Sequence, residues 1–438
     1  MAQVVRGVLW SLVYLLVVIT PLFFMLVGDP PPGRGWWLDL STALGFVGLA
    51  MLGLQFALTA RFHPVDAPYG LDAVLQYHKL SALVAFAFIL IHPVIMVFEL
   101  PQGLGLLNPF DTQASVLWGL GSVALMLVIV VTSLWRARLK LDYEVWRIGH
   151  GILAVAIVAT ALVHIWQVEY YVAGPWRRGL WVGMSVVLVG LLGHVRVVRP
   201  WQQMRRPWRV AEVEQLPGET CRLHLEADGH DGMRFEPGQF AWLTVGKSPF
   251  TIREHPFSFS SSAERTDRIS FTIKELGDFT STVADIEPGT RAYVDGPYGA
   301  FSYERNEAPG FVFIAGGIGI TPMMSMLRTL ADRGDRRPIF MFYANPSFED
   351  IAIREELDEL AEQLDLRLVH VLEDPPEGWD GETGLVTPEL LDRYLPEHDE
   401  RYEFFVCGPD PMREAVEPAL ADRGVPSDHI NFERFDFV

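Results

Sequence analysis

The fold is decided by two apolar stretches, QYHKLSALVAFAFILIHPVIMVF at residues 76–98 and WRIGHGILAVAIVATALVHIWQ at residues 146–167. Each stretch carries two histidines fourteen residues apart: His78 and His92 in the first, His150 and His164 in the second. On an α-helix, fourteen residues advance about 1400°, which is about 40° short of four turns, and rise about 21 Å. Each pair therefore lies on nearly one helix face. Two such helices side by side would place facing imidazoles at two levels.

Facing imidazoles at two levels of an apolar bundle match the ligand requirement of two stacked haems, because each iron takes one axial nitrogen from either side. A single histidine in an apolar helix is explained equally well by a hydrogen bond between helices. Two pairs of the same spacing favour coordination instead, and ionisable residues inside a membrane are functional by default. We therefore predict that His78, His92, His150 and His164 ligate two b-type haems.

Charge divides the chain of 438 residues into two unlike parts. Residues 1–200 hold 12 Lys+Arg and 9 Asp+Glu, a net charge of +3, whereas residues 201–438 hold 23 and 45, a net charge of −22. An apolar, weakly basic half thus precedes an acidic half that should be soluble. The acidic balance argues against nucleic acid as a partner. Two cysteines, Cys221 and Cys407, make neither a disulfide framework nor a thiolate metal site.

Six apolar segments are long enough to cross a lipid bilayer. They cover residues 8–27, 37–59, 76–98, 114–135, 146–167 and 176–197. Positively charged residues gather in the second and fourth of the loops that connect these segments, and after the sixth segment. By the positive-inside rule, this predicts a multi-pass protein of the cell membrane with both termini in the cytosol. The third and fifth segments then run in the same direction, so His78 pairs with His150 near the cytosolic face and His92 with His164 near the outer face.

The acidic half carries two different patterns. After a basic, Trp-rich connector (PWQQMRRPWRV, residues 200–210), short runs such as Phe240–Val245 and Ile269–Lys274 predict an antiparallel β-barrel. From about residue 310, apolar strands alternate with helices, which is typical of a doubly wound α/β sheet. The predicted domains are a six-helix transmembrane domain (1–199), the barrel (200–309) and the α/β domain (310–438).

Two glycine turns lie where strands of the predicted parallel sheet end. Gly316-Gly317-Ile318-Gly319-Ile320-Thr321-Pro322 joins a strand to a helix, and such glycines let the backbone approach a pyrophosphate at a helix N-terminus. Close packing alone would also explain them. Phe405-Val406-Cys407-Gly408-Pro409 ends a later strand at the same edge. Two such turns facing one crevice are required for a dinucleotide site.

The barrel contains two further runs with binding chemistry. His255-Pro256-Phe257-Ser258-Phe259-Ser260 combines an aromatic ring, hydroxyls and a fixed proline, which suit the edge of a flavin ring and its hydroxylated chain. Gly277-Asp278-Phe279-Thr280 offers backbone amides and a hydroxyl to phosphates. Either run taken alone is also compatible with an ordinary turn.

These motifs occur in the order seen in the ferredoxin–NADP reductase fold. Together with the six spans and two histidine pairs, they make nearly the whole chain resemble the NADPH oxidase and transmembrane ferric reductase superfamily. The resemblance implies FAD in the barrel, held by His255, Pro256, Phe257, Ser258, Ser260, Lys274, Gly277, Phe279 and Thr280. It implies NADPH or NADH in the α/β domain, held by Gly316, Gly317, Gly319, Thr321, Pro322, Cys407, Gly408 and Pro409.

The resemblance also implies roles in hydride transfer. Ser258 is expected near the reactive flavin nitrogen and Cys407 near the nicotinamide. Phe435 is expected to stack on the isoalloxazine until the nicotinamide displaces it, although Phe437 is a rival for that role. Relatives that bind NADPH often place an arginine for the 2′-phosphate after the second sheet strand. Here Tyr343–Ser347 has none, so preference for NADPH over NADH is open.

The function implied by the resemblance is transmembrane electron transfer from cytosolic NAD(P)H through FAD and two haems to an outer acceptor. The favoured acceptor is dioxygen, which would be reduced to superoxide, because the outer loops 99–113 and 167–178 show no evident metal-chelate site. Ferric chelates, a periplasmic redox partner, and a flavin reductase merely anchored by its membrane half are the alternatives. Nearby cations, Arg147, Arg177 and Arg178, either meet haem propionates or anchor the membrane interface.

Overall fold

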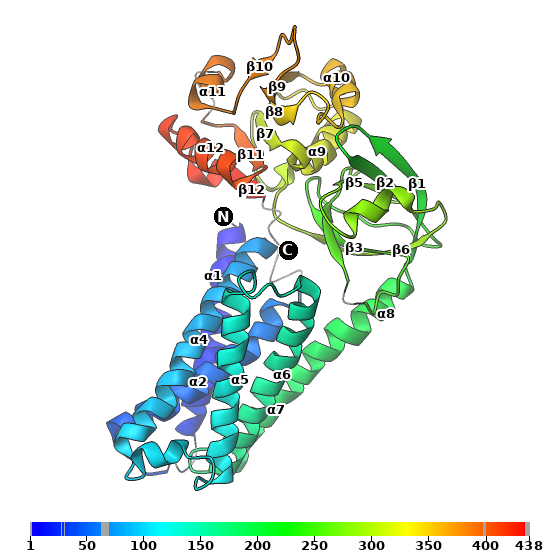
Figure 1. Ribbon diagram of the computed structural model, residues 1–438. Coiled ribbons are helices and arrows are strands. Elements are labelled where there is room, and N and C mark those ends of the chain that lie inside the picture. The colour runs from blue at the N-terminus through cyan, green and yellow to red at the C-terminus, as the bar shows by residue number, and fades with distance from the viewer. Residues whose placement is uncertain are drawn as a thin grey trace. The chain divides into compact units, whose positions relative to one another are not determined.

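The computed structural model describes residues 2–27, 29, 31–62, 70–251, 253–396 and 400–433 (Figure 1). The chain forms two compact units, Met1–Arg199 and Pro200–Val438.

The first unit is a bundle of long apolar helices, and six helices of the described residues are long and apolar enough to cross a membrane. They are α1 (Ala2–Met25), α2 (Trp36–Leu58), α4 (Leu71–Glu99), α5 (Ala114–Leu134), α6 (Tyr143–Val168) and α7 (Pro175–Gly193), with a short 3₁₀ turn, η1 (Gly103–Leu107), after α4. The six predicted spans are confirmed. Local signals set two of the starts: the Asp142 carboxylate accepts from the backbone N–H groups of Glu144 and Val145 ahead of α6, and Gly174-Pro175 opens α7.

Within this unit, α4 packs beside α2 and α5 beside α6 (Figure 1). The core between them includes Phe46 of α2, Ala85 of α4, Met126 of α5 and Ile157 of α6. After α7 the helix continues through a π-helical turn, η2 (His194–Val198), into α8 (Arg199–Met204). The connector expected from residue 200 is therefore helical as far as Met204.

The predicted antiparallel barrel is present. Its strands are β1 (Trp208–Leu216), β2 (Thr220–Ala227), β3 (Phe240–Val245), β4 (His255–Ser258), β5 (Arg268–Lys274) and β6 (Arg291–Tyr298), in the order β4-β3-β6-β1-β2-β5. The two edges meet where Phe259 bridges Phe271 and the Ser260 N–H donates to the Ser270 carbonyl at 2.8 Å. Two 3₁₀ turns, η3 (Thr280–Asp285) and η4 (Tyr303–Arg305), flank β6.

The predicted doubly wound sheet is also present, and all its neighbouring strands are parallel. The strands are β7 (Phe311–Gly316), β8 (Ile339–Ser347), β9 (Leu366–Asp374), β10 (Glu382–Thr383), β11 (Glu403–Cys407) and β12 (Ile430–Glu433). Their order is β10-β9-β8-β7-β11-β12. The helices are α9 (Ile320–Asp332), α10 (Arg354–Gln363), α11 (Pro388–Tyr394) and α12 (Asp410–Asp422), with η5 (Gly317–Gly319) and η6 (Ser427–His429) as 3₁₀ turns.

Alternation along β7 explains why both faces of this sheet are covered. Phe313 and its neighbours on one face pack with residues of α9 and α10, such as Leu327, whereas Ile314 and the other face pack with α11 and α12, for example with Leu420. Strand order reverses between β7 and β11, where Ala315 pairs with Cys407. In open parallel sheets, ligands bind beyond the carboxyl ends of strands at such a reversal.

Candidate functional site

The four histidines lie as two pairs between α4 and α6. The His78 and His150 ring centroids are 6.4 Å apart, and those of His92 and His164 are 6.3 Å apart. These are the pairs expected from the sequence. Metal–imidazole bonds are about 2 Å long and a ring nitrogen lies about 1.1 Å from its ring centre, so one metal ion between two imidazoles requires centroids about 6.2 Å apart. Both pairs therefore fit coordination of one iron between two rings.

The outward nitrogens of three of these rings are hydrogen-bonded. His92 Nδ1 lies 2.8 Å from the Ser41 carbonyl oxygen, and His164 Nδ1 lies 2.6 Å from that of Ser115. His150 Nδ1 lies 3.2 Å from the Ser133 hydroxyl. A ring that donates its Nδ1–H leaves the Nε2 lone pair for a metal, which is the usual arrangement of ligating histidines. None of the three serines was predicted from the sequence, because no spacing rule links α2 or α5 to a histidine of another helix.

Two glycines make room for the second histidine pair. A Cβ atom at Gly45 of α2 would lie 3.4 Å from the His92 ring, and one at Gly119 of α5 would lie 2.9 Å from His164 Nδ1. Each glycine stands four residues after the serine whose carbonyl contacts the same ring. The missing side chains let each imidazole approach the neighbouring backbone.

The cations near the spans have other partners. Arg177 is only 7% exposed, and its guanidinium donates to the carbonyls of Phe24, Met25, Val27, Asp29 and Ala173. Arg177 thus closes the end of α1, and its donors are occupied by backbone rather than free for propionates. Arg178 pairs with Glu169 at 2.9 Å. His194 stacks on Phe62 with ring centroids 5.5 Å apart, and His63 lies outside the described residues.

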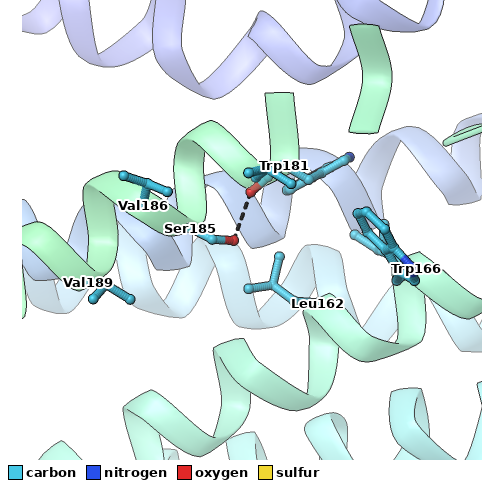
Figure 2. Close-up of a pocket in the computed structure, with 8 residues that line it drawn as sticks. Leu162, Trp166, Trp181, Ser185, Val186 and Val189 are labelled. Carbon is cyan, nitrogen blue, oxygen red and sulfur yellow. Dashed lines mark hydrogen bonds between the residues drawn. The ribbon is translucent and has the colours of Figure 1, made fainter. Parts of the chain in front are cut away.

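An apolar groove runs along the bundle between α6 and α7 (Figure 2). It is lined by Leu162, Ile165, Trp166, Trp181, Val182, Ser185, Val186 and Val189. The Ser185 hydroxyl donates to the Trp181 carbonyl at 2.7 Å, so its hydrogen is used within α7 (Figure 2). None of the four paired histidines lines this groove.

In the second unit, the first four residues of the predicted flavin motif form β4, which is the first strand in the sheet order of the barrel. His255 stacks on Phe279 with ring centroids 4.1 Å apart and planes 4° apart, and Phe257 lies 6.0 Å from Phe279. Ser258 is 4% exposed. The Ser260 hydroxyl is buried and bonds to that of Ser270 at 2.9 Å. The motif thus combines an aromatic platform with buried hydroxyls, and Pro256 lies between them on the strand.

The turn at Gly277–Thr280 is closed by its own hydrogen bonds. The Thr280 Oγ1 atom accepts from the N–H groups of Leu276 and Gly277 at 2.9 and 2.8 Å. The expected contact of this turn with a phosphate stays a prediction. A Cβ atom at Gly277 would meet nothing within 4 Å, so open space for a ligand lies beside the turn.

The barrel and the nucleotide turns meet within this unit. Lys274, at the end of β5, pairs with Asp350 beyond β8 at 3.1 Å. The Thr321 hydroxyl lies 3.5 Å from the Thr272 carbonyl and donates to the Ile318 carbonyl at 2.8 Å. The side chains of Lys274 and Thr321 therefore join the flavin and nucleotide motifs, and their expected contacts with the cofactors stay predictions. Pro322 is buried in the first turn of α9.

The two glycine turns are pressed together at the strand reversal. A Cβ atom at Gly319 would lie 2.2 Å from the Cys407 carbonyl oxygen, and one at Gly316 would lie 2.7 Å from Pro409. Gly408 has no room either, because its Cβ would lie 3.0 Å from the Gly316 nitrogen. Packing requires glycine at these three positions, and their expected contact with a dinucleotide stays a prediction. Gly317 is different: its φ is +52° and nothing lies within 4 Å of its Cβ position, so its backbone faces open space as a nucleotide-binding turn requires.

Cys407 ends β11 within the hydrophobic core and is 1% exposed. Burial, with Glu433 adding to it, raises the pKa of this thiol well above its usual value, so the thiol is neutral. The sulfur is covered by protein at the strand reversal, and its expected place near the nicotinamide stays a prediction. Phe435 and its rival Phe437 lie outside the described residues.

Comparisons with known proteins agree with this division. A family model described as ferric reductase like transmembrane component matches residues 44–161, an FAD-binding domain model matches 205–302, and an oxidoreductase NAD-binding domain model matches 313–418. NADH-cytochrome b5 reductase 1 of Pyricularia oryzae is 36% identical over 216 residues, which are 48% of this chain and 68% of that protein.

Two further similarities are more distant. The reductase component of propane 2-monooxygenase of Rhodococcus jostii is 31% identical over 254 residues, covering 56% of this chain and 66% of that protein. The FAD/NAD-binding domain of a Vibrio cholerae nitric oxide dioxygenase matches with 23% identity and a TM-score of 0.47, over 52% of this chain and 97% of that structure.

The three family models follow one another in the order of the three structural parts, membrane helices, antiparallel barrel and parallel sheet. A ferric-reductase-type membrane domain joined to FAD- and NAD-binding domains defines a multi-pass, NAD(P)H-dependent flavin oxidoreductase. The chain belongs to the superfamily of NADPH oxidases and transmembrane ferric reductases.

Proposed function

We propose that the chain moves electrons from cytosolic NAD(P)H to an acceptor on the outer side of the cell membrane, with FAD and two b-type haems as its redox groups. Dioxygen, giving superoxide, is the acceptor we favour. When bound, FAD takes two electrons from the nicotinamide as a hydride and releases them singly, and each haem iron carries one.

The observation that carries this proposal is the pair of centroid distances, 6.4 and 6.3 Å, at two levels of α4 and α6. Two iron sites in series across an apolar bundle have no use in a flavin reductase that the membrane only anchors. The four histidines would hold iron from both sides, and the hydrogen-bonded Nδ1 atoms of His92, His150 and His164 fix the orientation of those three rings. Basic residues after α5, Arg136, Arg138 and Lys140, support a cytosolic position for that loop and for both termini.

In the soluble unit, side chains and backbone of this chain would orient the flavin and the nicotinamide and exclude water from between them. The aromatic rings of His255, Phe257 and Phe279 offer a flat apolar surface beside the buried Ser258. The open backbone at Gly317 suits a pyrophosphate at the start of α9. Cys407 is buried at the strand reversal, and its apolar surroundings would help to exclude water from a hydride transfer beside it.

Dioxygen is favoured over ferric iron for one reason. With a histidine on either side of each iron, both acceptors would take their electron at the edge of the site, so the ligation does not distinguish them. Among the described residues, no group of three or more His, Cys, Asp or Glu side chains is arranged to hold a metal ion. A small apolar acceptor needs no such site, whereas a bound ferric ion does.

Ferric chelates remain the second candidate, because the membrane helices match the ferric reductase model over residues 44–161. A whole chelate that reacts in passing needs no protein ligands. Electron transfer to a periplasmic redox partner is the third candidate. Turnover that depends on an added partner protein would distinguish it from the other two.

NADH is a plausible donor beside NADPH. Arg354, the nearest arginine to the end of β8, lies with its guanidinium 4.8 Å from the Phe348 ring centre and 4.0 Å from the Asp358 carboxylate. Ser347 bonds to the Asp350 carboxylate at 2.9 Å. An acidic group beside a hydroxyl suits a ribose 2′-OH better than a 2′-phosphate.

The deciding experiment reduces the purified, lipid-reconstituted protein with NAD(P)H under nitrogen, then adds either air or ferric citrate. Fast haem reoxidation in air with about two superoxide per NAD(P)H establishes the oxidase, since each nicotinamide supplies two electrons. Fast ferric reoxidation with little superoxide establishes the ferric reductase instead. Haems that NAD(P)H never reduces would overturn the conduit itself.

A further inference from the structure

The two histidine pairs differ in the groups that receive their Nδ1 hydrogens. In the pair of His92 and His164, both rings point Nδ1 at backbone carbonyls, 2.8 Å away at Ser41 and 2.6 Å away at Ser115. In the other pair, His150 has only the Ser133 hydroxyl at 3.2 Å. His78 Nδ1 is buried and has no hydrogen-bond partner among the described residues.

The carbonyl contacts come from the same local pattern on two helices. Ser41 and Gly45 of α2, and Ser115 and Gly119 of α5, are each four residues apart. In a helix the carbonyl of residue i already accepts from the N–H of residue i+4, so its second lone pair is reached from the side. The glycine at i+4 leaves that side uncovered. A Cβ atom at this position would lie 2.9 Å from His164 Nδ1 on α5 and 3.4 Å from the His92 ring on α2.

The Ser41 hydroxyl strengthens this arrangement. It donates to the His92 carbonyl at 2.8 Å and lies 2.9 Å from His92 Nδ1. Because its hydrogen is already used, its lone pairs accept from the ring. Ser41 therefore offers His92 two acceptors, whereas the Ser133 hydroxyl, which donates to the Ile129 carbonyl at 2.6 Å, offers His150 one distant acceptor.

We propose that the two Ser-x-x-x-Gly pairs on α2 and α5 make His92 and His164 the more strongly electron-donating ligand pair, and thereby set the haem at this level to the lower midpoint potential of the two. An imidazole that donates Nδ1–H to a good acceptor becomes a more basic ligand, and a more basic ligand stabilises ferric over ferrous iron. Ser41, Gly45, Ser115 and Gly119 are positioning residues, since they act through the rings. This inference rests on the proposed function, and it makes the outer site the stronger reductant.

The test is a potentiometric titration of the reconstituted full chain, followed by haem absorbance, in which wild-type protein should show two waves. Gly119→Ala forces the His164 ring off its carbonyl, and it should raise the lower wave and leave the upper wave unchanged. Gly121→Ala is the matched control: it lies on the same helix, and nothing lies within 4 Å of its Cβ position. It should move neither wave.

Ser133→Ala should move the other wave, because it removes the only described acceptor of His150. Ser133→Thr keeps a hydroxyl and should restore the wild-type value. Thr132→Ala removes a similar intrahelical bond, to the Val128 carbonyl at 2.8 Å, and should change nothing. If Gly119→Ala fails to fold, Ser41→Ala provides the same test on the lower wave with a smaller upward shift.

Outcomes separate this inference from the function on which it rests. An upward shift of the upper wave in Gly119→Ala, or no shift in either Gly119→Ala or Ser41→Ala with both haems intact, overturns the assignment of potentials alone. A wild-type spectrum without low-spin, bis-histidine haem overturns the haem proposal as well.

Discussion

The candidate site of the membrane unit is built from side chains, whereas that of the soluble unit is built largely from backbone. The side chains are the four imidazoles of α4 and α6. The backbone forms the turns where Gly316, Gly319 and Gly408 let β7 and β11 end against each other. We therefore expect the membrane site to lose function when a side chain is truncated or replaced, and the soluble site to lose function when a glycine gains a side chain.

The largest effect is expected from removing an imidazole. His92→Leu should lower the haem content from two per chain to one and reduce turnover with any outer acceptor to background, because the second iron loses a ligand. NAD(P)H-dependent dye reduction by the soluble unit should survive. Pyridine haemochrome assay and turnover of reconstituted protein provide the measurements. His194→Leu, which alters a ring stacked on Phe62, is the control, and full turnover in His92→Leu would disprove the ligand assignment.

Adding one methyl group should break the backbone site. Gly319→Ala places a Cβ 2.2 Å from the Cys407 carbonyl oxygen, and overpacking of this kind costs about 3 kcal/mol at the upper end of its usual range. We expect a lower temperature of flavin release and a large loss of NAD(P)H oxidation. Gly183→Ala in α7, whose Cβ meets nothing within 4 Å, should leave the release temperature almost unchanged. Equal release temperatures for the two variants would contradict the packing explanation.

A matched pair of arginines sharpens the comparison within the membrane unit. Arg177→Met removes a buried guanidinium that donates to five carbonyls, and should cost about 2–3 kcal/mol, because charged hydrogen bonds of buried groups are worth that much. Arg178→Met removes an exposed ion pair to Glu169, which should cost under about 1 kcal/mol. Thermal unfolding in detergent measures both. A larger loss for Arg178→Met would argue against the capping role of Arg177.

The smallest effect concerns pH and the soluble unit. Glu356 of α10 lies 2.6 Å from Arg222 and also pairs with Arg328, which ties the barrel to the α/β domain. Burial opposes its charged form, but Arg328 and Arg222 outweigh that effect and hold the pKa of Glu356 below its usual value. A lowered folded-state pKa contributes stability that is present above about pH 4 and is lost as pH falls through that pKa.

Glu356→Gln should therefore lower the flavin-release temperature near pH 7, and the gap from wild type should shrink as pH falls toward 3. The measurement is a series of release temperatures from pH 7 to 3 on the full chain. Glu349→Gln, a nearby acidic residue on the β8–α10 connection, is the control. A gap that stays constant with pH would show that the carboxylate charge is not what stabilises the contact.

Much of the architecture could be predicted from the sequence, since it follows from periodicity. Six apolar runs predicted six helices, and the strand Phe240–Val245 was predicted with the bounds that β3 has. Facing histidines followed from a spacing of fourteen residues on two helices. The expected cofactor roles of Thr280 and Thr321 stay predictions, since each hydroxyl bonds within its own turn. Long-range packing decided the partners of Arg177, whose guanidinium reaches the carbonyls at the end of α1.

The sequence by itself determined which residue types stand at which helical or strand positions, because helix rise and strand alternation are local properties of the backbone. It therefore identified the imidazoles, the glycine turns and the order of the domains. Only the tertiary structure decided what lies behind each ring and each turn. The carbonyls of Ser41 and Ser115 reach His92 and His164 from other helices, about fifty residues away in the chain. Such contacts depend on how helices pack, which no local pattern specifies.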